Sequence, residues 1–143
     1  MKQNIIAQYT DLQKEIEEIK QNITRLTDKK EALEQESSVE IVKGGYGGEQ
    51  RYHIKEFAKA DIEETEYLIN KNIRLLRERQ KRAEELIVEI EEYINAIDDS
   101  RVRRMITLKY INGKTWYQVA QIMGEYYTQD SCKKQVQRYI KNV

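Results

Sequence analysis

The side chains best suited to molecular recognition are concentrated near the C-terminal end of the chain, in the segment QDSCKKQVQRYIK, residues 129–141. Its apolar residues Cys132, Val136 and Ile140 recur every four positions, which predicts a helix with one buried face. The opposite face then carries amides and ammonium groups, which bind the edges of bases and phosphate oxygens. Nucleic-acid recognition is therefore the candidate chemistry of this segment.

The outward residues divide by the contacts they can make. Lysine and glutamine can read guanine and adenine edges, and serine or aspartate in the first turn can add a base contact. Arginine suits phosphates, whose contacts dominate affinity and make it salt-dependent. The candidate DNA-binding residues are Gln129, Asp130, Ser131, Lys133, Lys134, Gln137, Arg138 and Lys141. The candidate phosphate contacts outside this segment are Arg101, Arg103, Arg104, Lys114 and Thr115.

Two short helices precede this segment and would position it. DDSRVRRMITLKYING offers Asp99 or Ser100 as an N-cap and ends at Asn112-Gly113, residue types that tolerate a left-handed C-cap. Thr115 then caps WYQVAQIM, and Gly124 ends it. Three short helices of which the last is basic predict a helix-turn-helix module. The structural alternative is a helical core with a basic face that is merely solvated.

The segment RVRRMITLKYINGKTWYQVAQIMG, followed by DSCKKQVQRYIKN, resembles region 4 of sigma-70 factors. The layout of the whole chain resembles the RinA/ArpU-type late transcription regulators of Gram-positive phages and prophages. This resemblance implies a phage-encoded regulator that binds promoter DNA and recruits RNA polymerase. It also implies base contacts by residues 129–131 and by Lys133, Lys134 and Gln137.

Two departures from the sigma pattern limit what the resemblance implies. The turn between Gly124 and Cys132 is longer than is usual for region 4, so the recognition helix can be displaced. Nothing in the chain resembles sigma region 2, which melts promoters and binds the core polymerase. We therefore do not expect the chain to act as a complete sigma factor.

Residues 1–97 predict a long antiparallel coiled-coil hairpin, so the expected fold is mainly all-α. Apolar positions alternate at spacings of three and four from Ile5 to Leu33. The second series is Ile62, Glu66, Ile69, Ile73, Leu76, Gln80, Ala83, Ile87, Ile90, Ile94 and Ile97. We expect a helix over 4–37, a glycine-rich small β-hairpin or loop over 38–57, a helix over 58–97 and the helix-turn-helix domain over 98–143.

Additional apolar residues beside the second series predict a further neighbour for that helix, because a wide apolar stripe buries against more than one element. They are Tyr67, Leu68, Leu75, Leu86 and Tyr93. We expect a homodimer through the coiled coil, for example two hairpins in a four-helix bundle. The alternative is that these side chains contact only the C-terminal domain.

The charge distribution supports a nucleic-acid partner for the C-terminal part. The 143 residues have a formal net charge of zero, 35% charged residues and no proline. Residues 1–97 contain 16 Lys/Arg and 21 Asp/Glu, whereas residues 98–143 contain 9 and 4. A charge asymmetry of this kind between the two parts of a chain is typical of nucleic-acid contact by the basic part.

Several functional classes are disfavoured by composition. One cysteine and one histidine, Cys132 and His53, allow neither an internal disulfide nor a protein-only zinc site, and no cofactor is expected. GGYGG, residues 44–48, lacks the flanking strand, helix and Lys-Ser/Thr of a phosphate loop. Without a catalytic constellation we do not expect an enzyme.

No segment has the apolar core of a signal peptide or membrane span, so a cytoplasmic protein without a membrane partner is expected.

Two other classes of protein remain open. A phage small terminase subunit also joins a DNA-binding helix-turn-helix to an oligomerising helical hairpin, and it would form rings of many subunits. A protein adaptor would use the coiled coil to bind another protein and would show no salt-dependent affinity for DNA.

Overall fold

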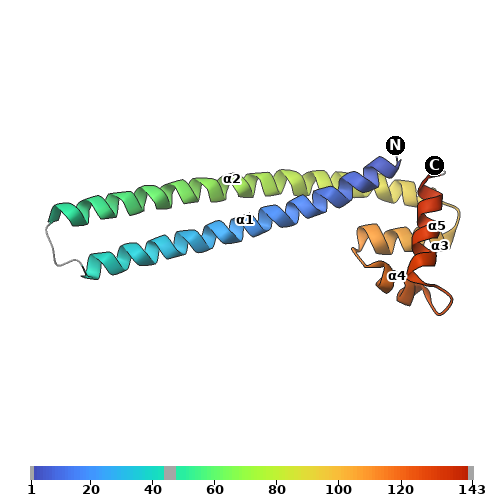
Figure 1. Cartoon of the computed structure of the whole chain (residues 1–143). Coiled ribbons are helices and arrows are strands. Elements are labelled where there is room, and N and C mark those ends of the chain that lie inside the picture. The colour runs from blue at the N-terminus through green and yellow to red at the C-terminus, as the bar shows by residue number, and fades with distance from the viewer. Residues whose placement is uncertain (1, 44–47, 142–143) are drawn as a thin grey trace. The chain divides into compact units, whose positions relative to one another are not determined.

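A computed structural model describes the backbone of residues 2–43 and 48–141 and the side chains of residues 5–37 and 58–140. Helices α1 (Lys2–Lys43) and α2 (Gly48–Asn95) form a long antiparallel hairpin (Figure 1). Three short packed helices follow. They are α3 (Ser100–Ile106), which passes directly into the π-helical turn η1 (Thr107–Ile111), then α4 (Trp116–Met123) and α5 (Gln129–Lys141). The all-α expectation is confirmed for the described residues.

The β-hairpin or loop expected over residues 38–57 is wrong for most of that segment. Residues 38–43 complete α1 and residues 48–57 begin α2, so both helices extend beyond the predicted bounds. Short alternations of apolar and polar residues suggested strands, but extending an existing helix adds one hydrogen bond per residue without a new nucleation step. Residues 44–47 of the glycine-rich stretch lie outside the described residues.

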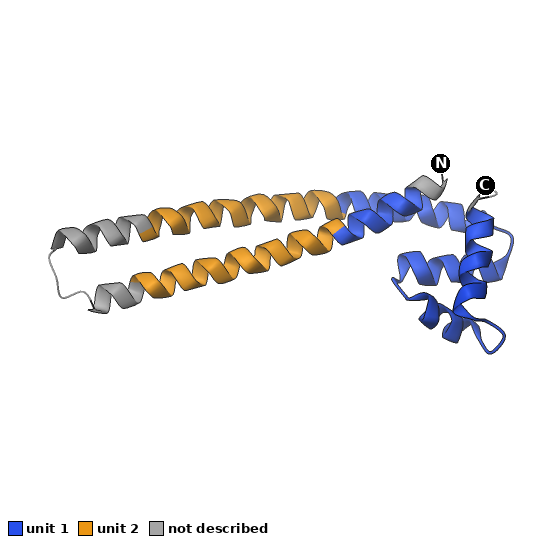
Figure 2. Ribbon diagram, viewed as in Figure 1, with its two compact units in different colours: residues 1–14, 81–143 blue, residues 15–80 orange. Residues whose placement is uncertain are grey.

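The chain divides into two compact units (Figure 2). Unit 1 comprises residues 1–14 and 81–143, and unit 2 comprises residues 15–80. In unit 2, two ion pairs connect the hairpin helices: Arg79 Nε lies 2.7 Å from Glu15 Oε1, and Lys30 Nζ lies 3.0 Å from Glu66 Oε1. Lys30 interrupts the apolar series of α1, and its hydrogen bond to Glu66 raises the pKa of its ammonium group.

The apolar seam of α2 differs from the predicted one at several positions. Glu66 and Gln80, predicted in the seam, are exposed. Ile87, also predicted in the seam, is only half-buried, whereas the preceding residue Leu86 and the residue preceding Glu66, Thr65, are each 2% exposed. The apolar stripe of α2 is wide enough for either the predicted or the observed set of positions to form the seam. Packing within the hairpin selects the set that contains Thr65 and Leu86.

The core of the three short helices lies in unit 1, where α5 packs against both α3 and α4. The side chains at its centre have no exposed surface: Met105, Ile106, Val119, Cys132 and Val136. The same unit also buries residues from the start of α1, the end of α2 and the segment that follows α2, namely Ile6, Tyr9, Leu12, Leu86, Ile90 and Ile97. The C-terminal helices therefore share one compact unit with both hairpin ends.

Candidate nucleic-acid interface

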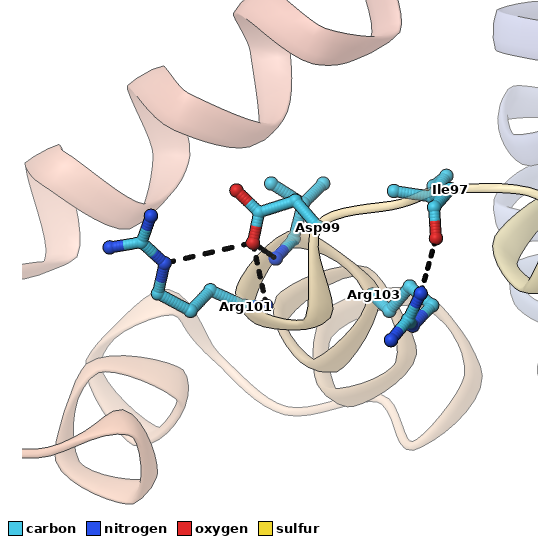
Figure 3. Close-up of polar contacts among 5 residues, drawn as sticks. Ile97, Asp99, Arg101 and Arg103 are labelled. Carbon is cyan, nitrogen blue, oxygen red and sulfur yellow. Dashed lines mark hydrogen bonds and ion pairs between the residues drawn. The ribbon is translucent and has the colours of Figure 1, made fainter.

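Asp99 begins α3 as its N-cap, as the sequence allowed. Its Oδ1 accepts hydrogen bonds from the backbone N–H groups of Arg101, at 2.8 Å, and Val102, at 3.5 Å (Figure 3). The bond from the Arg101 amide is the main cause of a lowered pKa of the Asp99 carboxyl group. The cap fixes the start of the helix that carries three of the predicted phosphate-binding arginines.

These three arginines have different surroundings. Arg101 is 67% exposed; its Nε lies 3.6 Å from Asp99 Oδ1, and a hydrogen bond to Tyr127 is the main cause of its raised pKa. Arg103 is half-buried and donates a hydrogen bond to the carbonyl oxygen of Ile97 (Figure 3). Arg104 is exposed. Arg101 and Arg104 are therefore more accessible to a phosphate than Arg103.

The N-terminus of α4 is closed by its own side chains. Thr115 Oγ1 accepts from the Gln118 amide at 3.2 Å, and Gln118 Oε1 accepts from the Thr115 amide at 3.0 Å, which together make a capping box. Thr115, predicted as a phosphate contact, thus uses its hydroxyl within the helix. Lys114 is half-buried beside it.

Helix α5 presents two unlike faces. Cys132, Val136 and Ile140 are at most 7% exposed, and burial raises the pKa of the Cys132 thiol. The exposed side chains are those of Gln129, Asp130, Lys133, Lys134, Gln137 and Arg138. The side chain of Lys141, the last residue of α5, lies outside the described residues.

Three of the predicted base-reading residues are engaged near the start of α5. Ser131 Oγ accepts from the Thr128 amide at 3.0 Å, and Thr128 Oγ1 accepts from the Ser131 amide at 3.1 Å, so this pair caps the helix. Asp130 Oδ2 lies 3.1 Å from Lys134 Nζ. Ser131 is therefore a capping residue, whereas Asp130 and Lys134 remain exposed and hold each other on the outer face.

Gln137 lies in a different environment from the residues at the start of α5. It lines a hollow of about 350 Å³ together with Ile140 of α5, Tyr110 of η1 and the α1 residues Ile6, Ala7, Thr10 and Asp11. All of these residues belong to unit 1. The first part of α5 therefore has a more open outer face than the turn around Gln137.

Aromatic residues near the connection from α4 to α5 did not follow from the sequence pattern. Tyr117 is 55% exposed and Tyr126 is 95% exposed. A hollow of about 650 Å³ is lined by Tyr117, Ala120, Gln121, Gly124, Glu125, Tyr127, Thr128 and Gln129. Exposed apolar side chains on α4, Tyr117 at 55% and Ile122 at 47%, are the signal that could have identified this surface.

A second aromatic group lies at the other end of α4. The rings of Tyr110 and Trp116 meet edge to face with centroids 6.4 Å apart, and Lys109 Nζ lies 5.3 Å from the Trp116 ring centroid. This distance is within the range of a cation–π contact. Lys109 is half-buried in this contact, so its ammonium group is less accessible to a phosphate than a fully exposed lysine would be.

The described residues thus form a helical hairpin and a small C-terminal helical domain with a basic outer face. No protein-family model, curated protein or solved structure matches the chain. Within the part of the chain that the structure describes, no helix is both long and apolar enough to cross a bilayer. Nor do the described residues include a group of three or more His, Cys, Asp or Glu side chains that could hold a metal ion.

Proposed function

We propose that the protein is a sequence-specific DNA-binding transcription regulator in which residues 98–143 act as a helix-turn-helix domain. The observation that carries the proposal is the division of α5 into two faces. Cys132, Val136 and Ile140 anchor the helix in the core, and the basic side chains of Lys133, Lys134 and Arg138 are exposed. A helix held in this way can enter the major groove of DNA without unfolding the domain.

In this proposal the first half of α5 reads bases. Gln129, Lys133 and Lys134 are exposed there and supply the donors and acceptors that distinguish base edges in the major groove. Arg101, Arg104 and Arg138 bind phosphates and supply most of the salt-dependent affinity. Gln137, beside α1, has a smaller part in base reading.

Regulation then proceeds by recruitment, with no chemical step performed by the protein. The sequence resemblance to sigma region 4 supports promoter DNA as the target and RNA polymerase as the second partner. The resemblance to the RinA/ArpU-type regulators supports a phage or prophage origin.

The test is selection of bound duplexes from a randomised DNA pool with the full chain, at low and at physiological salt. We expect one motif to be enriched at both salt concentrations, because base contacts persist where phosphate contacts weaken. Binding without enrichment would contradict sequence reading and favour a packaging role. No binding at either salt would contradict DNA as the partner.

A further inference from the structure

The outer side of α2 in unit 2 carries a stripe that does not face α1. Asp61, Glu64, Leu68, Lys71 and Leu75 are spaced by three and four residues, so they lie along one side of the helix. Tyr67 and Arg74, seven residues apart, lie along its edge and are counted as part of the stripe. The α1-facing side of α2 is marked instead by buried Thr65 and by Arg79, which reaches Glu15 of α1.

The charges of this stripe have no partners within the described residues. Asp61, Glu64, Lys71 and Arg74 are all exposed, and none forms an ion pair with another described side chain. By contrast, Glu66 and Arg79 on the neighbouring side are both paired with α1. Glu66 and Arg79 are therefore paired across the hairpin, whereas the charged side chains of the stripe form no ion pair with another described side chain.

The apolar residues of the stripe are also incompletely covered. Tyr67 is 61% exposed, and Leu68 and Leu75 are only half-buried. Two helices packed side by side cannot shelter apolar groups that lie outside their shared seam. A further neighbour would remove this apolar surface from water, which is favourable.

The order of charges along the stripe makes it complementary to itself. Acidic residues precede the central Tyr67 and Leu68, and basic residues follow them. When two such helices run antiparallel about this centre, Glu64 meets Lys71 of the second copy, and Asp61 meets Arg74. Tyr67 then lies against Leu68 of the second copy. A parallel in-register pairing would instead place like charges opposite each other.

We infer that this stripe is the contact surface for a second copy of the same chain. The two α2 helices pack antiparallel in an isologous interface, with four ion pairs around a central Tyr67–Leu68 contact. The same patch on both copies is the usual arrangement of a two-fold dimer. The inference does not depend on DNA binding, because all the residues that carry it lie in unit 2.

Charge reversal in the full chain tests the interface. Lys71→Glu combined with Arg74→Glu makes the stripe acidic, and we expect the dimer Kd from analytical ultracentrifugation to rise about tenfold or more, since each ion pair becomes a repulsion. The matched control is Arg25→Glu with Lys29→Glu on α1, which changes the net charge equally at exposed positions outside the stripe. The control should dimerise like the wild type.

Exchanging the acidic and basic residues of the stripe tests whether the two α2 helices run antiparallel. Adding Asp61→Lys and Glu64→Lys to Lys71→Glu and Arg74→Glu restores opposite charges across the antiparallel interface, so dimerisation should return. Circular dichroism of each variant should show unchanged helix content. A wild type that stays monomeric, a doubly reversed variant that dimerises like the wild type, or an exchanged variant that remains monomeric would each overturn the inference.

Discussion

Lys134 and Asp130 form an ion pair across one turn of the exposed face of α5, with 3.1 Å between Nζ and Oδ2. Both side chains are largely exposed, at 65% and 75%, so the pair is screened by solvent and its strength is small. Its importance lies in its position, because it places an acidic group on the part of α5 that we propose enters the major groove of DNA.

Asp130→Asn should strengthen binding to all duplexes. The change removes a charge that phosphates repel and releases Lys134 from its partner. Because an exposed ion pair contributes little energy, we expect the DNA affinity to rise by only about two- to fivefold. Fluorescence anisotropy with a selected and a scrambled duplex measures it, with Glu125→Gln, another exposed acid, as the control. A loss confined to the selected duplex would show instead that Asp130 reads a base.

Lys134→Ala should reduce the preference for the selected duplex over a scrambled one by about tenfold or more, the usual result of removing a base contact. Gln137→Ala is the matched comparison on the same helix, and it should keep most of the preference because Gln137 lines the hollow beside α1. Competition binding at fixed salt measures both variants. An equal loss for the two duplexes with Lys134→Ala would identify a phosphate contact.

Asp99→Ala should lower the Tm, because two backbone N–H groups at the start of α3 lose their acceptor. Asp98→Ala changes the adjacent exposed carboxylate, which is not the cap, and should have little effect. Thermal unfolding followed by circular dichroism compares the two. Equal Tm values would contradict the capping role.

The same residue predicts a pH dependence of stability. The pKa of Asp99 is lowered in the folded chain, so its contribution is complete above the ordinary aspartate pKa of about 4 and is lost as the pH falls through the lower folded value. The Tm difference between the wild type and Asp99→Ala should therefore shrink in acid. A difference that is constant from neutral to strongly acidic pH would contradict this assignment.

Leu86→Ala should lower the free energy of unfolding by about 2–5 kcal/mol, the usual cost of truncating a fully buried leucine. Leu86 is 2% exposed, whereas its neighbour Ile87, which the apolar spacing placed in the seam, is only half-buried. Ile87→Ala should therefore cost distinctly less in urea unfolding. The opposite order would show that the seam follows the predicted positions.

Local signals in the sequence determined the boundaries of the short helices. Asp99 and Thr115 cap α3 and α4 because their side-chain oxygens reach backbone amides within a few residues, whatever the rest of the chain does. Gly113 and Gly124 follow helix ends with φ angles of +68° and +121°, which other residues rarely adopt. The inner face of α5 was equally predictable, because Cys132, Val136 and Ile140 recur at helical spacing.

Helix propagation and tertiary packing decided what local signals left open. Residues 38–43 and 48–57 alternate like strands, yet they extend the two long helices, where continued helix growth is favoured over a separate hairpin. The wide apolar stripe of α2 fitted two seams, and only contact within the hairpin selected Thr65 and Leu86. The positions of Arg103 against the Ile97 carbonyl and of Gln137 beside α1 likewise depend on groups brought together by folding. The sequence by itself determined which residues are helical ends and faces, because those depend on near neighbours, whereas the partner of each face was decided by the packed chain.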